Sequence, residues 1–340
     1  MHLRRLGSTD LEISSLVFGG MSLGVSPSSE GFAMSDGEAE RALSVAFESG
    51  INAFDTANIY SDGLSESVLG RWISSRRAEV IVLTKCRFAT HGFRAADPSP
   101  PEFGLSRSAI QYACEASLRR LGTDYIDLFQ LHMQHRDVRI EETLRAIDDL
   151  VQSGKVRYVG CSNFTAYRLM QALWIADKSG LPKMASVQFP WSLVMRDVER
   201  ELVPISVECG LGTLVYSPLG RGFLSGKYKR GEAPPPDSRL AARRGVFNDY
   251  DQTRIWQILE VVTDVAKRYE APPAAVAIAW LLAKPSVSGV ILGVRNQSQL
   301  RDNLLAASLT LADGDRARLD RVSEPAWGYP YALISRYEPW

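Results

Sequence analysis

The feature that most constrains the fold of this 340-residue chain is a regular alternation of short apolar runs with longer amphipathic segments. The short runs have the composition of buried strands, and each is followed by a segment with apolar residues at helical spacing. The expected strands are residues 16–18, 51–54, 80–84, 126–131, 156–160, 185–188, 212–216 and 287–292. The expected helices are residues 36–49, 65–75, 106–121, 140–153, 165–178, 198–209, 254–269, 273–282 and 298–307.

Strict alternation of this kind indicates a parallel sheet, because parallel neighbours need a crossover that helices supply. Eight strand and helix units predict an α/β fold, a closed (β/α)8 TIM barrel, for which about 250 residues plus insertions is typical. A doubly wound sheet is the alternative, but its dinucleotide fingerprint belongs in an early strand-to-helix turn. The glycines of residues 19–24 do not match that fingerprint. We therefore expect one barrel domain over residues 1–340.

Three segments lie outside the repeating pattern. Residues 3–6 and 11–13 flank a turn and predict an N-terminal β-hairpin that covers one end of the barrel. The connections 86–105 and 217–250 are long and contain several prolines. Loops of this length in a compact domain are usually functional. We expect both to be irregular and to lie over the C-terminal mouth.

Composition narrows the class of partner. Lys plus Arg and Asp plus Glu are equal at 39 each, so no net field favours nucleic acid or a membrane surface. The four cysteines show neither a disulfide framework nor a zinc-ribbon spacing, which fits a reducing compartment. The first 20 residues contain no apolar stretch suited to a signal peptide or membrane span. We expect a cytoplasmic protein that acts on a small molecule; the oligomeric state stays open.

Polar residues stand at the ends of the expected strands. Asp55 follows the second strand, Tyr60 comes five residues later, Lys85 follows the third strand and His132 follows the fourth. In a barrel, these ends converge on one mouth. A lysine after an apolar run is costly to bury unpaired, and Asp55 is its natural partner. A cation favours the phenolate of a nearby tyrosine, while a histidine orients or polarises a carbonyl. Together they predict proton donation to a carbonyl oxygen.

A metal site is the alternative interpretation of the same region. His132, His135 and Asp137 supply ligand types suited to a metal-dependent barrel hydrolase. The remaining histidines, His2 and His91, adjoin no expected strand end. We therefore favour the proton-donating set and expect no metal.

Six segments, in order along the chain and at barrel spacing, resemble the aldo-keto reductases, and the resemblance covers nearly the whole chain. The segments are residues 54–60, 83–85, 117–128, 130–132, 160–164 and 216–219. The resemblance implies a catalytic tetrad. Tyr60 matches its general acid, Lys85 the group that lowers the tyrosine pKa, Asp55 the partner of that lysine, and His132 the orienting residue.

The resemblance also implies an extended nicotinamide dinucleotide, usually NADPH with NADH as the alternative, held without a Rossmann fold. The matching positions are Ser162, Asn163 and Gln188 for the carboxamide, Tyr216 for the nicotinamide ring, Ser217, Leu219, Gly222 and Lys227 for the pyrophosphate, and Gly293, Arg295, Gln299 and Asn303 for the adenosine end. A preference for NADP over NAD depends mainly on Arg295, because a guanidinium suits the 2′-phosphate.

The implied activity is reversible reduction of an aldehyde or ketone to an alcohol. The alternative is a redox-sensing subunit that binds the cofactor, similar to the potassium-channel β subunits. We assign Trp191 and Phe88 to the substrate pocket; Trp191 stands where the family often has a tyrosine. The substrate and the preferred direction stay open.

An aromatic tail ends the chain, with Trp327, Tyr329, Tyr331 and Trp340. Large exposed apolar side chains usually mark a contact surface. Two placements are equally consistent with the sequence: the tail packs under the barrel, or it closes the substrate site.

Overall fold

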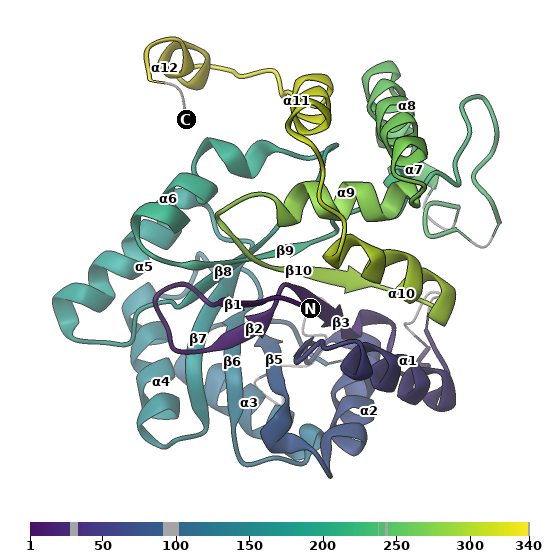
Figure 1. Ribbon diagram of the computed structural model, residues 1–340. Coiled ribbons are helices and arrows are strands. Elements are labelled where there is room, and N and C mark those ends of the chain that lie inside the picture. The colour runs from purple at the N-terminus through teal and green to yellow at the C-terminus, as the bar shows by residue number, and fades with distance from the viewer. Residues whose placement is uncertain (28–32, 91–101, 237, 242–243, 339–340) are drawn as a thin grey trace.

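The computed structural model describes residues 1–27, 33–90, 102–236, 238–241 and 244–338. Eight parallel strands form a closed barrel, in which the last strand pairs with the first (Figure 1). The strands are β3 (Leu16–Gly19), β4 (Ala53–Asp55), β5 (Ile81–Cys86), β6 (Ile126–Leu131), β7 (Val156–Ser162), β8 (Ser186–Pro190), β9 (Gly212–Tyr216) and β10 (Val287–Gly293). The predicted (β/α)8 barrel is confirmed.

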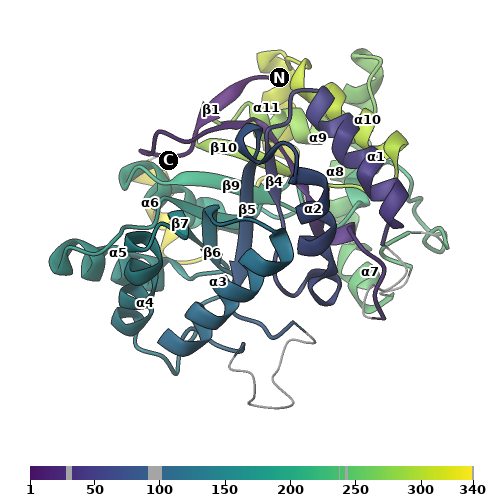
Figure 2. The same cartoon turned by 90° about the horizontal axis from the view of Figure 1, so that it is seen from below.

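Helices surround the barrel in both views (Figures 1 and 2). Those that follow the predicted pattern are α1 (Asp36–Glu48), α2 (Leu64–Ile73), α3 (Arg107–Leu121), α4 (Ile140–Gln152), α5 (Ala166–Ser179), α6 (Leu202–Glu208), α8 (Thr253–Arg268), α9 (Pro273–Leu282) and α10 (Gln297–Leu304). The expected helix 198–209 divides into a 3-10 turn, η4 (Asp197–Arg200), and α6.

Three helices were not predicted: α7 (Arg244–Tyr250), α11 (Asp313–Val322) and α12 (Tyr331–Tyr337). The first of them shows that the expectation of an irregular stretch over 217–250 was wrong in part. This connection also contains η5 (Phe223–Ser225), whose Phe223 ring stacks on Tyr250 at the end of α7. The helix therefore depends on contacts between distant side chains, which helical periodicity does not report.

The predicted N-terminal hairpin is confirmed as β1 (Leu3–Arg5) paired antiparallel with β2 (Glu12–Ser14). Its Leu6 and Ile13 are fully buried in a cluster with the apolar side chains inside the barrel. The amide of Ser8 donates a hydrogen bond of 2.9 Å to the carbonyl of Gly210, just before β9 begins. The hairpin therefore closes the N-terminal end of the barrel, and the opposite end holds the polar residues.

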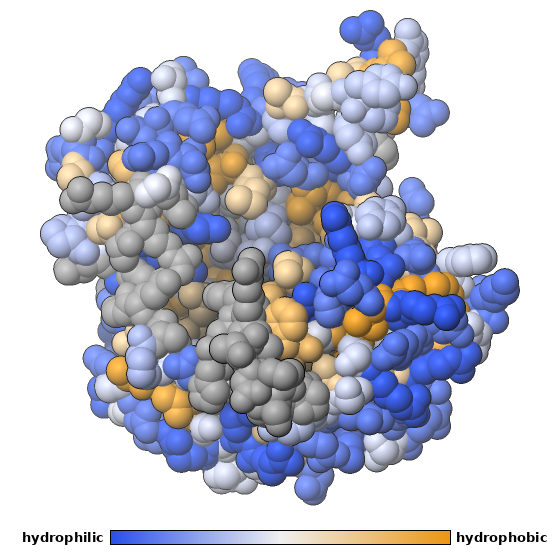
Figure 3. All heavy atoms as spheres, turned by 180° about the vertical axis from the view of Figure 1, so that it is seen from behind, coloured by the Kyte–Doolittle hydropathy of each residue, from blue (hydrophilic) through white to orange (hydrophobic). Residues whose placement is uncertain are grey.

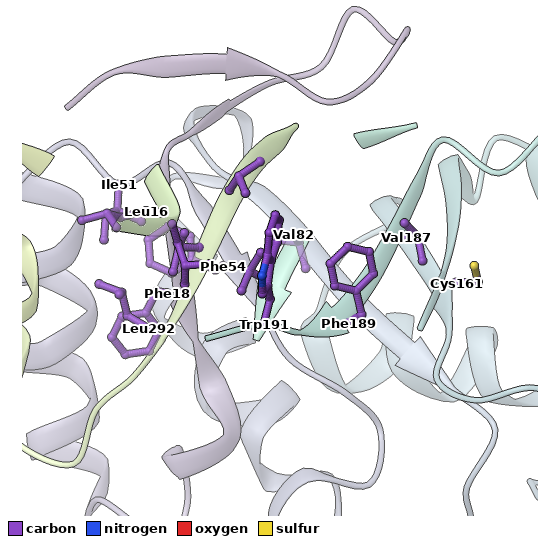
Figure 4. Packing of buried hydrophobic residues seen from close by; sticks show 14 of the residues in the cluster. Leu16, Phe18, Ile51, Phe54, Val82, Cys161, Val187, Phe189, Trp191 and Leu292 are labelled. Carbon is purple, nitrogen blue, oxygen red and sulfur yellow. The ribbon is translucent and has the colours of Figure 1, made fainter. Parts of the chain in front are cut away.

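Alternation along the strands separates an apolar outer layer from the barrel interior. Phe54 points outward to the helices, where its ring lies 5.0 Å from that of Trp72 on α2 (Figure 4). The next residue, Asp55, therefore points inward. Lys85 and Cys86 show the same relation on β5, because Cys86 belongs to the outer cluster. Two-residue periodicity thus directs both charged side chains into the mouth.

Both long connections begin at the C-terminal ends of their strands, β5 and β9. Part of each predicted loop, residues 91–101, 237 and 242–243, lies outside the described residues. Among the described helices, none combines the length and apolar character needed to cross a membrane.

The aromatic tail follows α11 and lies at the periphery of the fold (Figure 1). The Arg200 guanidinium lies 5.8 Å from the rings of Trp327 and Tyr331. The Tyr331 hydroxyl donates a 2.6 Å hydrogen bond to Glu201. Tyr329 is 88% exposed, and Trp340 lies outside the described residues. The described part of the tail therefore contacts the segment that leads into α6.

The contact between the N-terminal hairpin and the start of β9 predicts a specific effect on stability. A Cβ atom at Gly212 would lie 2.5 Å from the Leu6 side chain and 2.9 Å from the Gly7 amide nitrogen. We expect Gly212→Ala to lower the free energy of unfolding by about 1–3 kcal/mol, because overpacking displaces the hairpin. Gly314→Ala on α11, where nothing lies within 4 Å, is the control and should be neutral. Urea unfolding measures both, and equal midpoints would contradict the prediction.

Candidate active site

A buried ion pair occupies the centre of the mouth. Lys85 is fully buried, and its Nζ donates to Asp55 Oδ2 at 2.5 Å and to the Thr56 carbonyl at 2.9 Å. Burial by itself lowers the pKa of Lys85, but Asp55 and Tyr60 raise it above its ordinary value. The amine therefore stays protonated, because an opposite charge replaces the water that it has lost.

Two glutamines hold the other carboxylate oxygen. Asp55 Oδ1 accepts hydrogen bonds from Gln188 Nε2 at 2.9 Å and from Gln130 Nε2 at 3.2 Å. All three residues are buried. We had assigned Gln188 to the cofactor, and sequence reasoning missed Gln130. The available signal was its position on β6, two residues before His132, a spacing that puts both side chains on the same face of an extended chain.

Tyr60 stands on a tight turn beside the ion pair. Its hydroxyl lies 3.4 Å from Lys85 Nζ. The residues after it, Ser61, Asp62 and Gly63, all have positive φ, at 49°, 55° and 86°. Such angles are unfavourable for residues with side chains and occur where the surrounding structure imposes them. The amide of Asn58 donates to the Lys85 carbonyl at 3.2 Å, which ties this loop to β5.

The environment keeps the Tyr60 phenol protonated. Burial raises the pKa of Tyr60, and the Lys85 cation opposes that effect without reversing it. Lys85 therefore acts in the direction that we predicted, although the net shift is upward. A protonated phenol beside a fixed ammonium is suited to give up a proton, because the ammonium stabilises the phenolate that remains.

His132 lies edge-on to two rings, with centroids 5.8 Å from Tyr60 and 5.3 Å from Phe88. Burial and the Lys85 charge hold the pKa of His132 well below its ordinary value. Its Nδ1 is buried and has no hydrogen-bond partner among the described residues. The imidazole is therefore neutral, with one N–H donor and one acceptor nitrogen at the mouth.

Three predicted cofactor residues meet beside His132. Asn163 Nδ2 donates to the His132 carbonyl at 2.8 Å and to Ser162 Oγ at 3.0 Å. The Tyr216 hydroxyl donates to Asn163 Oδ1 at 2.7 Å. Burial, with a contribution from Tyr60, raises the pKa of Tyr216 to about 12. The structure therefore joins the ends of β6, β7 and β9 around one spot.

The loop after β9 turns back tightly on itself. Ser217, Gly220, Arg221 and Gly222 all have positive φ, between 52° and 92°. Within the loop, the amides of Gly220, Gly222 and Phe223 donate hydrogen bonds to the carbonyls of Ser217, Leu219 and Gly220. Arg221 was not predicted. One pocket is lined by Pro190, Ser192, Met195, Tyr216, Ser217, Gly220, Arg221 and Tyr250.

Two further cations lie near each other beside this loop. Burial and the Arg295 charge both lower the pKa of Lys227. A Cβ atom on Gly222 would lie 3.5 Å from Lys227 Nζ. Cations brought together in this way are stabilised by an anion between them. The residues therefore fit the phosphate groups of a dinucleotide.

The predicted adenosine residues gather where β10 leads into α10. Gln299 Oε1 accepts a 3.1 Å hydrogen bond from the Arg295 amide. Asn303 is buried one turn further along α10, and Gly293, at the end of β10, is exposed. Leu219, in the loop after β9, packs against the hydrophobic cluster outside the barrel.

The two predicted pocket residues are placed differently. Phe88 is 8% exposed and contacts His132 directly. Trp191 is 2% exposed, donates to Glu199 at 2.8 Å and packs edge-on against Trp280 at 6.1 Å. Figure 4 shows Trp191 within the hydrophobic cluster. A role for Trp191 in the pocket stays a prediction. Because Trp191 is buried, it would shape the pocket by supporting the residues that line it.

The mouth lies on the face opposite the hairpin. Figure 3 shows that face hollowed between hydrophilic rims, with hydrophobic side chains in parts of the hollow. Within the described ranges, no three His, Cys, Asp or Glu side chains lie close enough to hold a metal. His135 instead accepts a 3.3 Å hydrogen bond at Nδ1 from the Leu105 amide. The metal alternative therefore gains no support from this geometry.

Comparison with known proteins identifies the family. The sequence profile of the Aldo/keto reductase family matches residues 15–324. The chain belongs to the aldo/keto reductase family. It is similar to the aldo-keto reductase AMT2 of Alternaria alternata, with 33% identity over 93% of this chain and 90% of the relative. Protein tas of Escherichia coli and versiconal hemiacetal acetate reductase of Aspergillus parasiticus are each 31% identical over 97% of this chain and 99% of the relative.

The ion pair of this aldo/keto reductase generates a prediction about stability. Lys85→Met or Asp55→Asn should each lower the free energy of unfolding by about 3–5 kcal/mol, because each leaves one buried charge without its partner. The double variant should lose less than the sum of the two single losses. Urea unfolding of all four proteins measures the coupling. Strict additivity would contradict a direct interaction.

His132 predicts a dependence of stability on pH. The pKa of His132 is lower in the folded protein than its ordinary 6.5, so protonation favours the unfolded chain. Its contribution should be complete above pH 6.5 and should be lost progressively as the pH falls below that value. His132→Gln should have a shallower decline between about pH 6.5 and 5. Urea unfolding across this range tests the difference, and parallel curves would be incompatible with it.

Proposed function

We propose that the protein is an NADPH-dependent oxidoreductase that reduces an aldehyde or ketone to an alcohol, reversibly, with Tyr60 as general acid. The observation that carries the proposal is the Lys85 ammonium, which is bonded to Asp55 and lies 3.4 Å from the Tyr60 hydroxyl. We propose that residues 1–340 act as one domain. A cytoplasmic location is also proposed, because all four cysteines are free thiols.

Residues of the chain have different proposed roles at the carbonyl group of the substrate. Tyr60 gives its proton to the carbonyl oxygen, and Lys85 stabilises the resulting phenolate. Asp55, held by Gln130 and Gln188, keeps the ammonium in place. Neutral His132 donates a hydrogen bond that orients the carbonyl. A reduced nicotinamide, when bound, supplies the hydride.

The proposed cofactor set lies along one side of the mouth. Ser162 and Asn163 would hold the carboxamide, and Tyr216 would stack on the ring. Lys227 and the loop 217–222 would hold the pyrophosphate. Arg295 would bind the 2′-phosphate, which is the basis for proposing NADPH over NADH. The name of the Aspergillus parasiticus relative, a reductase, agrees with this activity.

Replacing the acid tests the proposal. Tyr60→Phe should lower carbonyl reduction by about 10²–10⁴-fold, because it removes the proposed general acid beside the Lys85 ammonium. The measurement is oxidation of NADPH and of NADH with a panel of aldehydes and ketones. Tyr158→Phe is the control, since its hydroxyl contacts Asp10 of the hairpin loop at the closed end of the barrel.

The same screen separates the two candidate functions. Full activity of Tyr60→Phe would refute the proposed role of the phenol. NADPH that binds with no turnover of any carbonyl, together with a stable partner in pull-down, would favour the redox-sensing subunit. Fluorescence titration of NADPH should show that Tyr60→Phe still binds it.

A further inference from the structure

Arg87 is a buried cation that the proposed chemistry does not use. It follows β5 directly and is 7% exposed. Its Nε and Nη1 are buried and have no hydrogen-bond partner among the described residues. Burial lowers the pKa of Arg87, and the exposed Asp137 offsets this only in part. A guanidinium is a fixed fork of five N–H donors, and burying such donors unpaired is unfavourable.

Aromatic packing holds this guanidinium without satisfying its donors. The Arg87 Cζ lies 4.4 Å from the ring centre of Phe103 and 5.5 Å from that of Phe88. Cation–π contacts of this kind offset part of the lost hydration. The contacts act on the face of the guanidinium, whereas its N–H groups point outward in its plane. The planar edge is therefore left for an acceptor outside the described protein atoms.

The backbone at Arg87 is also unusual. Its φ is +146°, a value that residues with side chains rarely adopt. The Gly104 amide donates to the Arg87 carbonyl at 2.9 Å and holds this conformation. Strained positions tend to occur at functional sites, where the surrounding structure imposes them.

One aromatic ring separates Arg87 from the candidate active site. Phe88, which contacts the guanidinium, lies edge-on to His132 at 5.3 Å. The side-chain Nδ2 of Asn58, in the loop that carries Tyr60, donates to the Phe88 carbonyl at 2.7 Å. The position of Arg87 is thus linked to the loop that supplies the proton.

We propose that Arg87 is a specificity-determining residue that binds the carboxylate of the substrate, so that the preferred substrates are aldehydes or ketones that also carry a carboxylate. The inference deepens the reductase function proposed above and depends on it. A monovalent planar acceptor matches the site better than a phosphate dianion. Arg87 supplies one positive charge, and the nearby Asp137 carboxylate opposes further negative charge.

The test compares two substrates of similar shape, 4-carboxybenzaldehyde, which carries a negative charge, and its neutral methyl ester. The wild-type protein should favour the acid by about 10–100-fold in kcat/KM, the range expected for hydrogen bonds to a charged group. Arg87→Met keeps the apolar stem and should bring this ratio close to one, mainly by raising KM for the acid. Arg87→Lys keeps the charge but loses the fork, and should give an intermediate ratio.

Arg76→Met is the matched control. Arg76 also has a buried Nε without a partner among the described residues, and its Cζ lies 4.5 Å from the ring of Trp72. This variant should keep the wild-type ratio. No preference for the acid in the wild type, or an equal loss on acid and ester in Arg87→Met, would overturn the proposal. The second result would mean that Arg87 only supports Phe88.

Calorimetric binding of terephthalate distinguishes failure of this inference from failure of the proposed function. If neither aldehyde is reduced, the reductase function fails. Binding of terephthalate to the wild type that is lost in Arg87→Met would still support the carboxylate site. An absence of binding to the wild type would overturn that site, whatever the turnover result.

Discussion

The ion pair between Lys85 and Asp55 is the interaction on which the mouth of this barrel depends. A fully buried ammonium is tolerated only when an opposite charge and good acceptors replace water. The structure supplies Asp55 and the Thr56 carbonyl for the amine, and two glutamine amides for the second carboxylate oxygen. Because these groups come from β4, β6 and β8 as well as β5, the ion pair requires the closed barrel.

The same cation shifts the pKa of both rings beside it. Burial raises the pKa of the Tyr60 phenol and lowers the pKa of the His132 imidazole, so both are neutral. The Lys85 charge lowers the pKa of both rings. It favours loss of the phenol proton and disfavours gain of an imidazole proton. One buried charge thereby supports the roles that we propose for the two rings, the phenol as acid and the imidazole as a neutral hydrogen-bond donor.

Charge recognition at the mouth is local, although the chain has equal numbers of acidic and basic residues. Lys227 lies close enough to Arg295 for the two charges to affect each other, in a region suited to phosphate. Arg87 instead contacts Phe88, whose ring lies edge-on to His132. Under the functions proposed above, Lys227 and Arg295 would orient the cofactor and Arg87 would orient the substrate. The protein would not need a net positive charge for either.

The alternation of strands and helices, and the polar residues at the strand ends, were readable from the sequence alone. Periodicity reports which segments are buried strands and helices, so it predicted the barrel, and the positions of Asp55 and Lys85 at strand ends predicted that they meet at one mouth. The resemblance also covered residues that support the fold: Asp127 binds Arg77 and Arg157 outside the site.

Only the tertiary structure decided which buried polar groups found partners. Gln130 gained a role because its amide reaches Asp55, whereas Trp191 faces Glu199 in the wall. The sequence does not distinguish Arg87 from a surface arginine, whereas in the fold its Nε and Nη1 are buried without a partner among the described residues. Periodicity carries no information about such partners. A hydrogen bond between distant strands forms only when the donor–acceptor distance is correct to within a few tenths of an ångström, and only the tertiary structure sets that distance.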